Sequence, residues 1–349
     1  MTLTPPRSHA AQRALSQLQA LRDELITALR DAASVLGPPP DPTRHAWLRD
    51  GGAHGGGDRL GFAATAAFNR ATANISCVHY DDLPEKRLAS ATALSCIIHP
   101  APPAAPSMHL HTSLTELRDG AASWRIMADL NPSQPEEPEA QHFRHALTDA
   151  APTLATRAFA EGDRYFFIPA LGRHRGVVHF YLEGHATPSP EADAQLAARV
   201  TRAAIHTYAH ILRSRLTLPP TAESLRHQLR YHTLYAFQVL TLDRGTTSGL
   251  LVHNQNDAGI LGSLPSHLDA ALLASWRPRM PQAQQPLLDA LTGALPDPAP
   301  DGRTALDADA RLRLAEAIRG FYREHPAALE LQARGSVVPP TVANHAASR

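Results

Sequence analysis

The sequence predicts an α+β protein whose sheet is largely antiparallel. Two observations lead to this prediction. Strand-like runs follow one another through much of the first half of the chain, and segments with helical spacing of apolar residues stand before and after them. Consecutive strands flanked by helices indicate an α+β arrangement, because strands that alternate with helices would instead predict a parallel sheet.

The individual elements are expected from local patterns. Apolar residues at helical spacing predict helices, and short apolar runs bounded by turn residues predict strands. Helices are expected at residues 13–36, 140–155, 190–216, from about Pro265 onward, and at 307–325. Strands are expected at residues 73–80, 91–100, 107–117, 122–130, 163–170 and 175–184. Residues 51–61 are expected as a flexible glycine loop, and residues 234–254 as a strand, a tight turn at 243–245 and extended chain.

Charge and composition exclude some classes of function. The 349 residues carry 33 acidic and 33 basic side chains, so the formal net charge is zero. This balance argues against binding to nucleic acid or to a membrane surface by electrostatics. The sequence has no signal-peptide pattern at its start, no apolar run long enough to span a bilayer and only two cysteines. We expect a cytoplasmic protein.

Histidine is the unusual component of the sequence. Twenty residues are histidine, and six of them fall within residues 79–145. In an extended chain, side chains two residues apart point to the same face, so His109 and His111 of "MHLHT" would share one. Imidazole is both a common metal ligand and a proton carrier near neutral pH. The residues alone leave three interpretations open: metal ligands, catalytic groups, or hydrogen-bonded histidines of a polar cleft.

Five segments, in one order along the chain, resemble the oxygen-dependent coproporphyrinogen III oxidases. They read "FNRATANISCVHYDDLP", "SCIIHPAPPAAPSMHLHTS", "WRIMADLNP", "DRYFFIPALGRHRGVVHFYLE" and "YAFQVLTLDRGTTSGLL". The resemblance implies a flat, largely antiparallel sheet sandwiched between helices, and a homodimer. It also implies O2-dependent oxidative decarboxylation of substrate propionates to vinyl groups without an organic cofactor. We therefore expect one domain over residues 13–334, a loose segment at 1–12 and a disordered tail at 335–349.

The resemblance assigns roles to several residues of the central segments. Ser95 matches a substrate-site serine, and His109 matches a proton-donor histidine. His99 and His142 match two histidines of a metal site proposed for the family. These matches imply one pocket that combines proton transfer with metal binding.

Two carboxylates are also carried over from the resemblance. Asp129 of "ADLNP" and Asp243 of "LDRG" match aspartates that hold pyrrole N–H groups and assist proton removal. Arg244 follows Asp243 and is expected beside the substrate. From the residues alone, both aspartates would be read as turn residues.

Other positions of the family pattern are changed in this sequence. The asparagine and arginine that follow the proton-donor histidine are His111 and Ser113 here. Serine cannot reproduce the bidentate contact of an arginine with a carboxylate. The substrate loop Gly-Gly-Arg corresponds to His253, Asn254 and Gln255, so a second arginine is lost, and the triple-glycine strand reads "RIMA".

These changes suggest a new substrate on an old scaffold. The leading hypothesis is O2-dependent oxidative decarboxylation or desaturation of a small-molecule or peptide-derived substrate in specialised metabolism. A Fe or Cu ion would activate O2, held by His99, His109, His111 and His142, with His253 as a further candidate. One alternative is the reaction of the family itself in haem biosynthesis. The other is a catalytically degenerate paralogue that binds a porphyrin, a metal or a partner protein.

Overall fold

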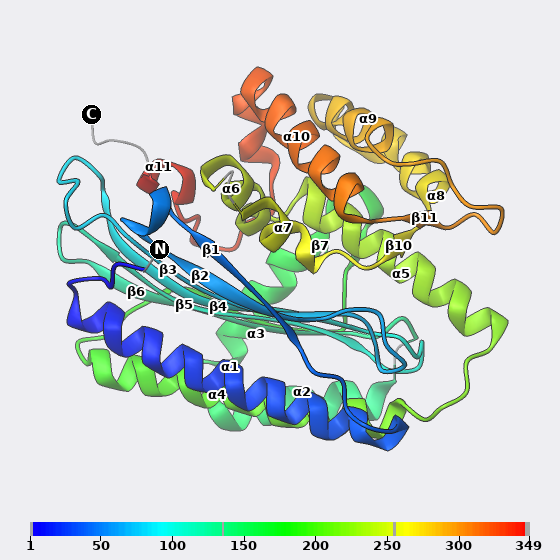
Figure 1. The fold of residues 1–349 in the computed structure, drawn as a ribbon, viewed down its shortest axis with the longest axis horizontal. Helices are drawn as coiled ribbons and strands as arrows, with labels where there is room; N and C mark the ends of the chain where they lie inside the picture. Colours follow the sequence, from blue (N-terminus) through cyan, green and yellow to red (C-terminus); the bar gives the residue numbers. More distant parts are fainter. Residues whose placement is uncertain (1–2, 135, 254–255, 346–349) are drawn as a thin grey trace.

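The fold is built around one antiparallel sheet (Figure 1). A computed structural model describes residues 3–134, 136–253 and 256–345. Seven strands are joined in the order β1-β2-β3-β4-β5-β6-β9, and every neighbouring pair runs antiparallel. The strands are β1 (Thr43–Leu48), β2 (Gly55–Phe62), β3 (Phe68–His79), β4 (Leu88–Pro100), β5 (Ser107–Leu117), β6 (Ala122–Asn131) and β9 (Val178–His185). The prediction of an α+β fold with a largely antiparallel sheet is confirmed.

Helices cover both faces of this sheet (Figure 1). One layer consists of α1 (His9–Ala33), α2 (Glu137–Ala150), α3 (Ala155–Phe166) and α4 (Pro190–Arg215). The other consists of α5 (Ala222–Thr241), α6 (Arg244–Val252), α7 (Asp257–Ile260), α8 (Ala270–Ser275), α9 (Gln285–Gly293), α10 (Ala308–Glu324) and α11 (Thr341–His345). Two short antiparallel strand pairs lie outside the main sheet. They are β7 (Phe167–Ile168) with β8 (Arg173–His174), and β10 (His267–Leu268) with β11 (Thr304–Ala305). None of the helices in the described ranges combines the length and the hydropathy needed to cross a bilayer.

The two faces of the sheet differ in character. Side chains alternate along each strand, so neighbouring residues belong to different faces. On β5, Met108 and Leu110 are buried in the apolar core beneath α1 and α4. His109 and His111 of the same strand face the opposite layer, where they line a cavity. The sequence prediction that these two histidines share one face is confirmed.

Residues 51–61, expected as a flexible loop, mostly belong to strand β2. The glycines allow the chain to lie close to its neighbours. A Cβ atom on Gly57 would lie 2.1 Å from the carbonyl oxygen of Ile75, and one on Gly55 would lie 2.1 Å from that of Cys77. The expectation of a loop was wrong because glycine is normally depleted in strands, and here it permits close backbone contact.

The prediction for residues 234–254 is wrong as well, because the described part of this segment is helical. The segment contains residues 234–241, which end α5, and all of α6. Every residue from Tyr231 to Thr241 is buried, so the helix lacks the polar stripe that reveals a helical period. Asp243 is the N-cap of α6, and its side chain accepts a hydrogen bond from the Thr246 N–H at 2.7 Å. Of residues 163–170, also expected as a strand, the first four complete α3 and only Phe167–Ile168 form a strand, β7.

Both ends of the described chain are attached to the sheet. Helix α1 begins at His9, capped by the Ser8 hydroxyl, rather than at residue 13. Before it, the Thr4 N–H donates to the Gly52 carbonyl at 3.0 Å. Near the other end, Lys86 Nζ donates to the His345 carbonyl at 2.8 Å. Both segments are expected from the sequence to be loose, and these hydrogen bonds join residues from each of them to the rest of the protein.

Candidate active site

A cavity of about 590 Å³ lies between the polar face of the sheet and the second helix layer. Strands β3 to β6 form its floor, and α6, α7 and residues 337–345 contribute to its other walls. Six residues predicted for the site line this cavity: Ser95, His109, His111, Ser113, Asp243 and His253. Four of these six, Ser95, His109, His111 and Ser113, lie on the floor, whereas the helical wall was not expected from the sequence.

His109 is held from behind by a buried carboxylate. Its Nδ1 atom lies 3.1 Å from Asp129 Oδ1 and 3.3 Å from Arg175 Nη2. Because the carboxylate favours a proton on Nδ1, we assign Nε2 as the nitrogen available to a substrate. This arrangement orients His109 for proton exchange with a molecule in the cavity.

Asp129 is fully buried and does not line the cavity, unlike the expected pyrrole-binding carboxylate. Its Oδ2 atom receives hydrogen bonds from Asn131 Nδ2 at 2.6 Å and from Arg175. Burial alone would raise the pKa of Asp129, but the Arg175 charge, followed by His109 and Asn131, holds that pKa below its ordinary value. Asp129 is thus an ionised group that positions His109.

A second ionised network surrounds Asp243 on the wall of the cavity. The Tyr165 hydroxyl donates to Asp243 Oδ1 at 2.8 Å and accepts a hydrogen bond from Arg125 Nη2 at 3.4 Å. Burial would raise the pKa of Asp243, but Arg125, the Thr246 N–H, His109 and Tyr165 together lower it. Asp243 is therefore a carboxylate that a substrate can reach.

Arg125 is a cavity residue that sequence reasoning noted only as part of "RIMA". It lies on β6 directly opposite Ser113 of β5, on the same face. Its Nε atom is 3.1 Å from Glu183 Oε2, and Glu183 also lines the cavity. Strand alternation could have revealed it, because Arg125 shares the parity of Asp129 on the same strand. A guanidinium therefore remains available one strand away from the position where the family arginine is lost.

Three other residues predicted for the site do not line this cavity. His99 is buried, with Nδ1 3.0 Å from Ser107 Oγ and Nε2 3.1 Å from the Ser263 carbonyl oxygen. His142 lies on α2, across the sheet from the cavity, with its ring centroid 5.7 Å from that of His210. Arg244 donates through Nε to the Ala333 carbonyl at 2.9 Å and does not line the cavity. Asn254 and Gln255 lie outside the described residues.

The four histidines proposed as Fe or Cu ligands are therefore not brought together. Only His109 and His111 share the cavity, and His111 Nε2 lies 3.0 Å from Ser113 Oγ. Burial, followed by the charges of Arg125 and His109, lowers the pKa of His111 well below its ordinary value. Within residues 3–134, 136–253 and 256–345, no group of three His, Cys, Asp or Glu side chains could hold a metal ion. These residues do not fit the expected metal site.

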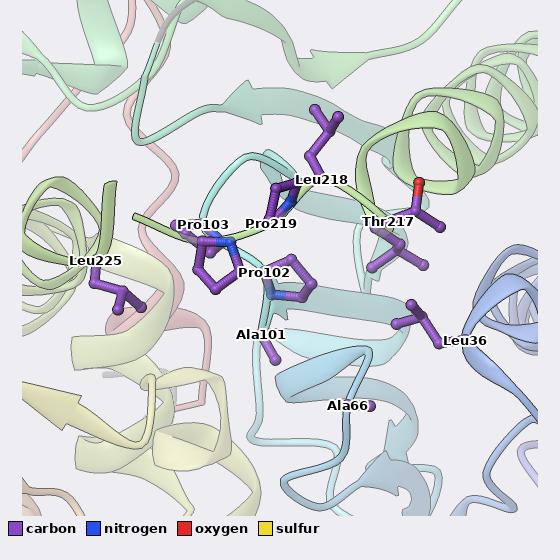
Figure 2. A pocket seen from close by; sticks show the side chains of 11 residues that line it. Leu36, Ala66, Ala101, Pro102, Pro103, Thr217, Leu218, Pro219 and Leu225 are labelled. Carbon is purple, nitrogen blue, oxygen red and sulfur yellow. The ribbon is translucent and has the colours of Figure 1, made fainter. Parts of the chain in front are cut away.

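A second pocket of about 360 Å³ offers none of this chemistry (Figure 2). It lies where the residues around Pro102 meet the segment around Pro219. Its lining is leucine, alanine and proline together with Thr217, so no titratable side chain lines it. The first cavity is therefore the candidate active site.

The C-terminal segment closes part of the first cavity, so its removal is a direct test of access. Val337, Pro340 and His345 are among its lining residues, and the Tyr80 hydroxyl lies within hydrogen-bonding distance of His345 Nδ1, at 3.0 Å. We expect deletion of residues 336–349 to raise KM more than it lowers kcat, because the cavity loses a wall that excludes water. Steady-state kinetics measure both constants. An unchanged KM in a folded truncated protein would contradict this role.

Comparison with known proteins assigns the family. The sequence profile described as coproporphyrinogen III oxidase matches residues 14–292. This chain belongs to the coproporphyrinogen III oxidase family. It is 31% identical over 242 residues to the oxygen-dependent coproporphyrinogen-III oxidase of Rickettsia akari (strain Hartford), covering 65% of this chain and 84% of that protein. The enzyme of the same name from Rickettsia bellii (strain OSU 85-389) is 30% identical over 237 residues, covering 64% and 82%.

Family membership fixes the enzyme class. The coproporphyrinogen oxidase-like chain is an oxygen-dependent oxidoreductase of the oxidative decarboxylase type, as expected from the sequence. The matched region contains the cavity floor and α5 to α8, whereas α10 and the wall formed by residues 337–345 follow it in the chain.

Proposed function

We propose that this protein oxidatively decarboxylates propionate side chains of a coproporphyrinogen with O2 as the oxidant. The observation that carries the proposal is one cavity in which His109, backed by buried Asp129, faces the same space as Asp243 and Arg125. Proton exchange, N–H recognition and carboxylate recognition are thus available side by side. The family match and the names of the relatives support this reading over the leading hypothesis of a different substrate.

The reaction balances without an organic cofactor. Each propionate, R–CH2–CH2–COO⁻, reacts with one O2 and one proton to give R–CH=CH2, CO2 and H2O2. The C–C bond to the carboxylate breaks, the C=C bond forms, and two electrons pass to O2. In this scheme the side chains transfer only protons, and O2 accepts both electrons as the sole oxidant.

The side chains have separate tasks in this scheme. Asp243 is ionised, so lone pairs of its carboxylate that are not already used can accept a hydrogen bond from an N–H group of a pyrrole ring. His109 can accept or return a proton at Nε2 while Asp129 stabilises the imidazolium. Arg125 can contact a propionate, since it lines the cavity beside Ser113.

Turnover of coproporphyrinogen III tests the proposal. Purified protein is incubated with this substrate in air and without O2, and the products are separated by chromatography. We expect vinyl products and one CO2 per vinyl group in air only. A folded protein that gives no vinyl product in air would overturn the proposal.

The position of the cavity arginine gives a second, sharper test. Directly opposed residues on one sheet face have Cβ atoms about 4.5–5.5 Å apart, and like charges there destabilise. We therefore expect Ser113→Arg alone to lower stability and Arg125→Ser alone to raise KM. The double variant Ser113→Arg/Arg125→Ser should recover part of both losses, because it keeps one guanidinium on the same sheet face, directly opposite its original position. Urea unfolding and steady-state kinetics measure the cycle, and strictly additive losses would exclude this exchange.

A second candidate function is supported by the charge balance of the cavity. Arg125 already pairs with Glu183, and Arg175 already pairs with Asp129. A substrate with several carboxylates must compete with these partners, whereas a less acidic substrate need not. Oxidative decarboxylation of a small-molecule or peptide-derived acid other than a porphyrinogen is therefore the second candidate. It predicts no turnover of coproporphyrinogen III, and O2 consumption with a smaller acid.

A further inference from the structure

A row of side chains on β3 continues beyond the cavity to an arginine. Thr72 and Asn74 line the cavity floor, and Arg70 is the next residue on the same sheet face. Two residues along a strand span about 7 Å, so Arg70 stands one step beyond the cavity lining. On the neighbouring strand β2, Arg59 lies directly opposite Asn74 and therefore shares this face.

The second helix layer adds a third arginine. Arg311 lies in the first turn of α10. Burial lowers the pKa of both Arg59 and Arg70, and the charge of Arg311 lowers it further. Arg59 packs against Gly262, where an added Cβ would lie 2.9 Å from Arg59 Nη1. The next residue, Ser263, lines the cavity. Arg59 and Arg70 therefore lie beside one end of the cavity, and Arg311 is near enough for its charge to act on both.

Two of these arginines, Arg70 and Arg311, form no ion pair with a carboxylate among the residues that the structure describes. Arg70 Nε is buried and has no hydrogen-bond partner there. Burial, followed by the charges of Arg311 and Arg59, lowers the pKa of Arg70 to about 10. Asp307, which lies near Arg311, already caps α10 by accepting the Ala310 N–H at 2.8 Å.

Gathering half-buried like charges destabilises a folded protein, and Arg70 and Arg311 form no ion pair within the described ranges that would offset this cost. Such an arrangement is typical of a site that an anion completes. We infer that Arg59, Arg70 and Arg311 form an anion subsite at the end of the cavity, which binds a carboxylate arm of the substrate. The identity of that arm as a substrate propionate rests on the proposed function. The subsite supplies guanidinium groups in place of the family arginine that is Ser113 in this chain.

Anion-dependent thermal stability of the full chain tests the subsite without turnover. The probe is sodium tricarballylate, a tricarboxylate, compared with sodium phosphate and with sodium chloride at equal ionic strength. A ligand that binds only the native state raises Tm. We expect tricarballylate to raise the Tm of the wild-type protein more than chloride does. Arg70→Met and Arg311→Met should weaken its apparent Kd by about tenfold or more, as loss of a charged hydrogen bond does.

Arg313→Met is the matched control. Arg313 lies two residues further along α10, is exposed, and donates to the Ala294 carbonyl at 2.8 Å. This variant should keep the full tricarballylate shift. A second readout separates binding from a structural role: without any added anion, Arg70→Met should have a higher Tm than the wild type, because like-charge repulsion is relieved.

The outcomes are distinct. A tricarballylate shift equal in the wild type, Arg70→Met and Arg311→Met would overturn the subsite, as would no shift in the wild type. A shift with phosphate alone would overturn the assignment to a carboxylate. Failure of coproporphyrinogen III turnover would overturn the proposed function instead, and the anion titration would still decide the subsite.

Discussion

His109→Gln is expected to lower kcat by about 10²- to 10⁴-fold, the usual contribution of one positioned acid or base. Glutamine is close to histidine in size and can still hydrogen-bond to Asp129, but it cannot carry a proton between substrate and solvent. The side chain lines the cavity and has Nδ1 fixed 3.1 Å from Asp129 Oδ1. Single-turnover rates with saturating substrate measure the effect. Unfolding in urea should be little changed.

His142→Gln is the control for this prediction. His142 lies on the opposite side of the sheet, so its replacement should leave kcat unchanged. The comparison also distinguishes two hypotheses. If His109 and His142 were both ligands of the four-histidine metal site expected from the sequence, the two variants would lower kcat equally. Comparable losses in the two variants would refute the assignment of His109 as the proton-transfer group.

Arg175→Met is expected to lower the free energy of unfolding by about 3–5 kcal/mol, because it leaves the buried Asp129 charge without its main partner. The Arg175 and Asp129 side chains are only 1% and 0% exposed. Arg175 Nη1 also donates to Gln238 Oε1 at 2.7 Å, and that bond is lost too. Urea unfolding at pH 7 measures the loss. Arg175→Lys keeps the charge and should recover part of it, although it cannot reproduce the geometry of the guanidinium.

The stability lost in Arg175→Met should depend on pH, because it depends on the ionisation of Asp129. Its pKa is lowered in the folded protein, so its pairing stabilises the fold above the unfolded-state pKa of about 3.9 and is lost as the pH falls below that value. In Arg175→Met, burial instead raises the pKa of Asp129. The difference in unfolding free energy between the two proteins should therefore shrink between pH 5 and pH 3. A difference that is independent of pH would show that packing, not the ion pair, explains the loss.

The strands were predictable because one face of the sheet packs against the apolar core and the other lines a polar cavity. On β5, the alternation of Leu110 with His109 and His111 gives a period of two that the sequence displays openly. Helix α5 gave no such signal, since its second half is buried on all sides. The run could not be distinguished from a strand by periodicity, and Asp243 was read as a turn residue although it is a helix cap.

The site was predictable only in part, for a different reason. Strand parity and the resemblance placed His109, Ser113 and Asp243 in one cavity, but the partners of these residues are long-range. Arg175 precedes β9 and reaches Asp129 across 46 positions of sequence. No local pattern encodes such a contact. His99 matched a family motif, yet both of its ring nitrogens lie within hydrogen-bonding distance of Ser107 and Ser263.

The two-faced sheet has an evolutionary consequence. Replacing a cavity-facing residue of β4, β5 or β6 alters what the enzyme can accept, while the adjacent residues that face α1 and α4 keep their packing undisturbed. Alternate residues of the same strands therefore determine substrate specificity and the stability of the fold. A lineage can exchange His111 or Ser113 without rebuilding its core, and this separation explains how a recognisable scaffold coexists with altered substrate positions.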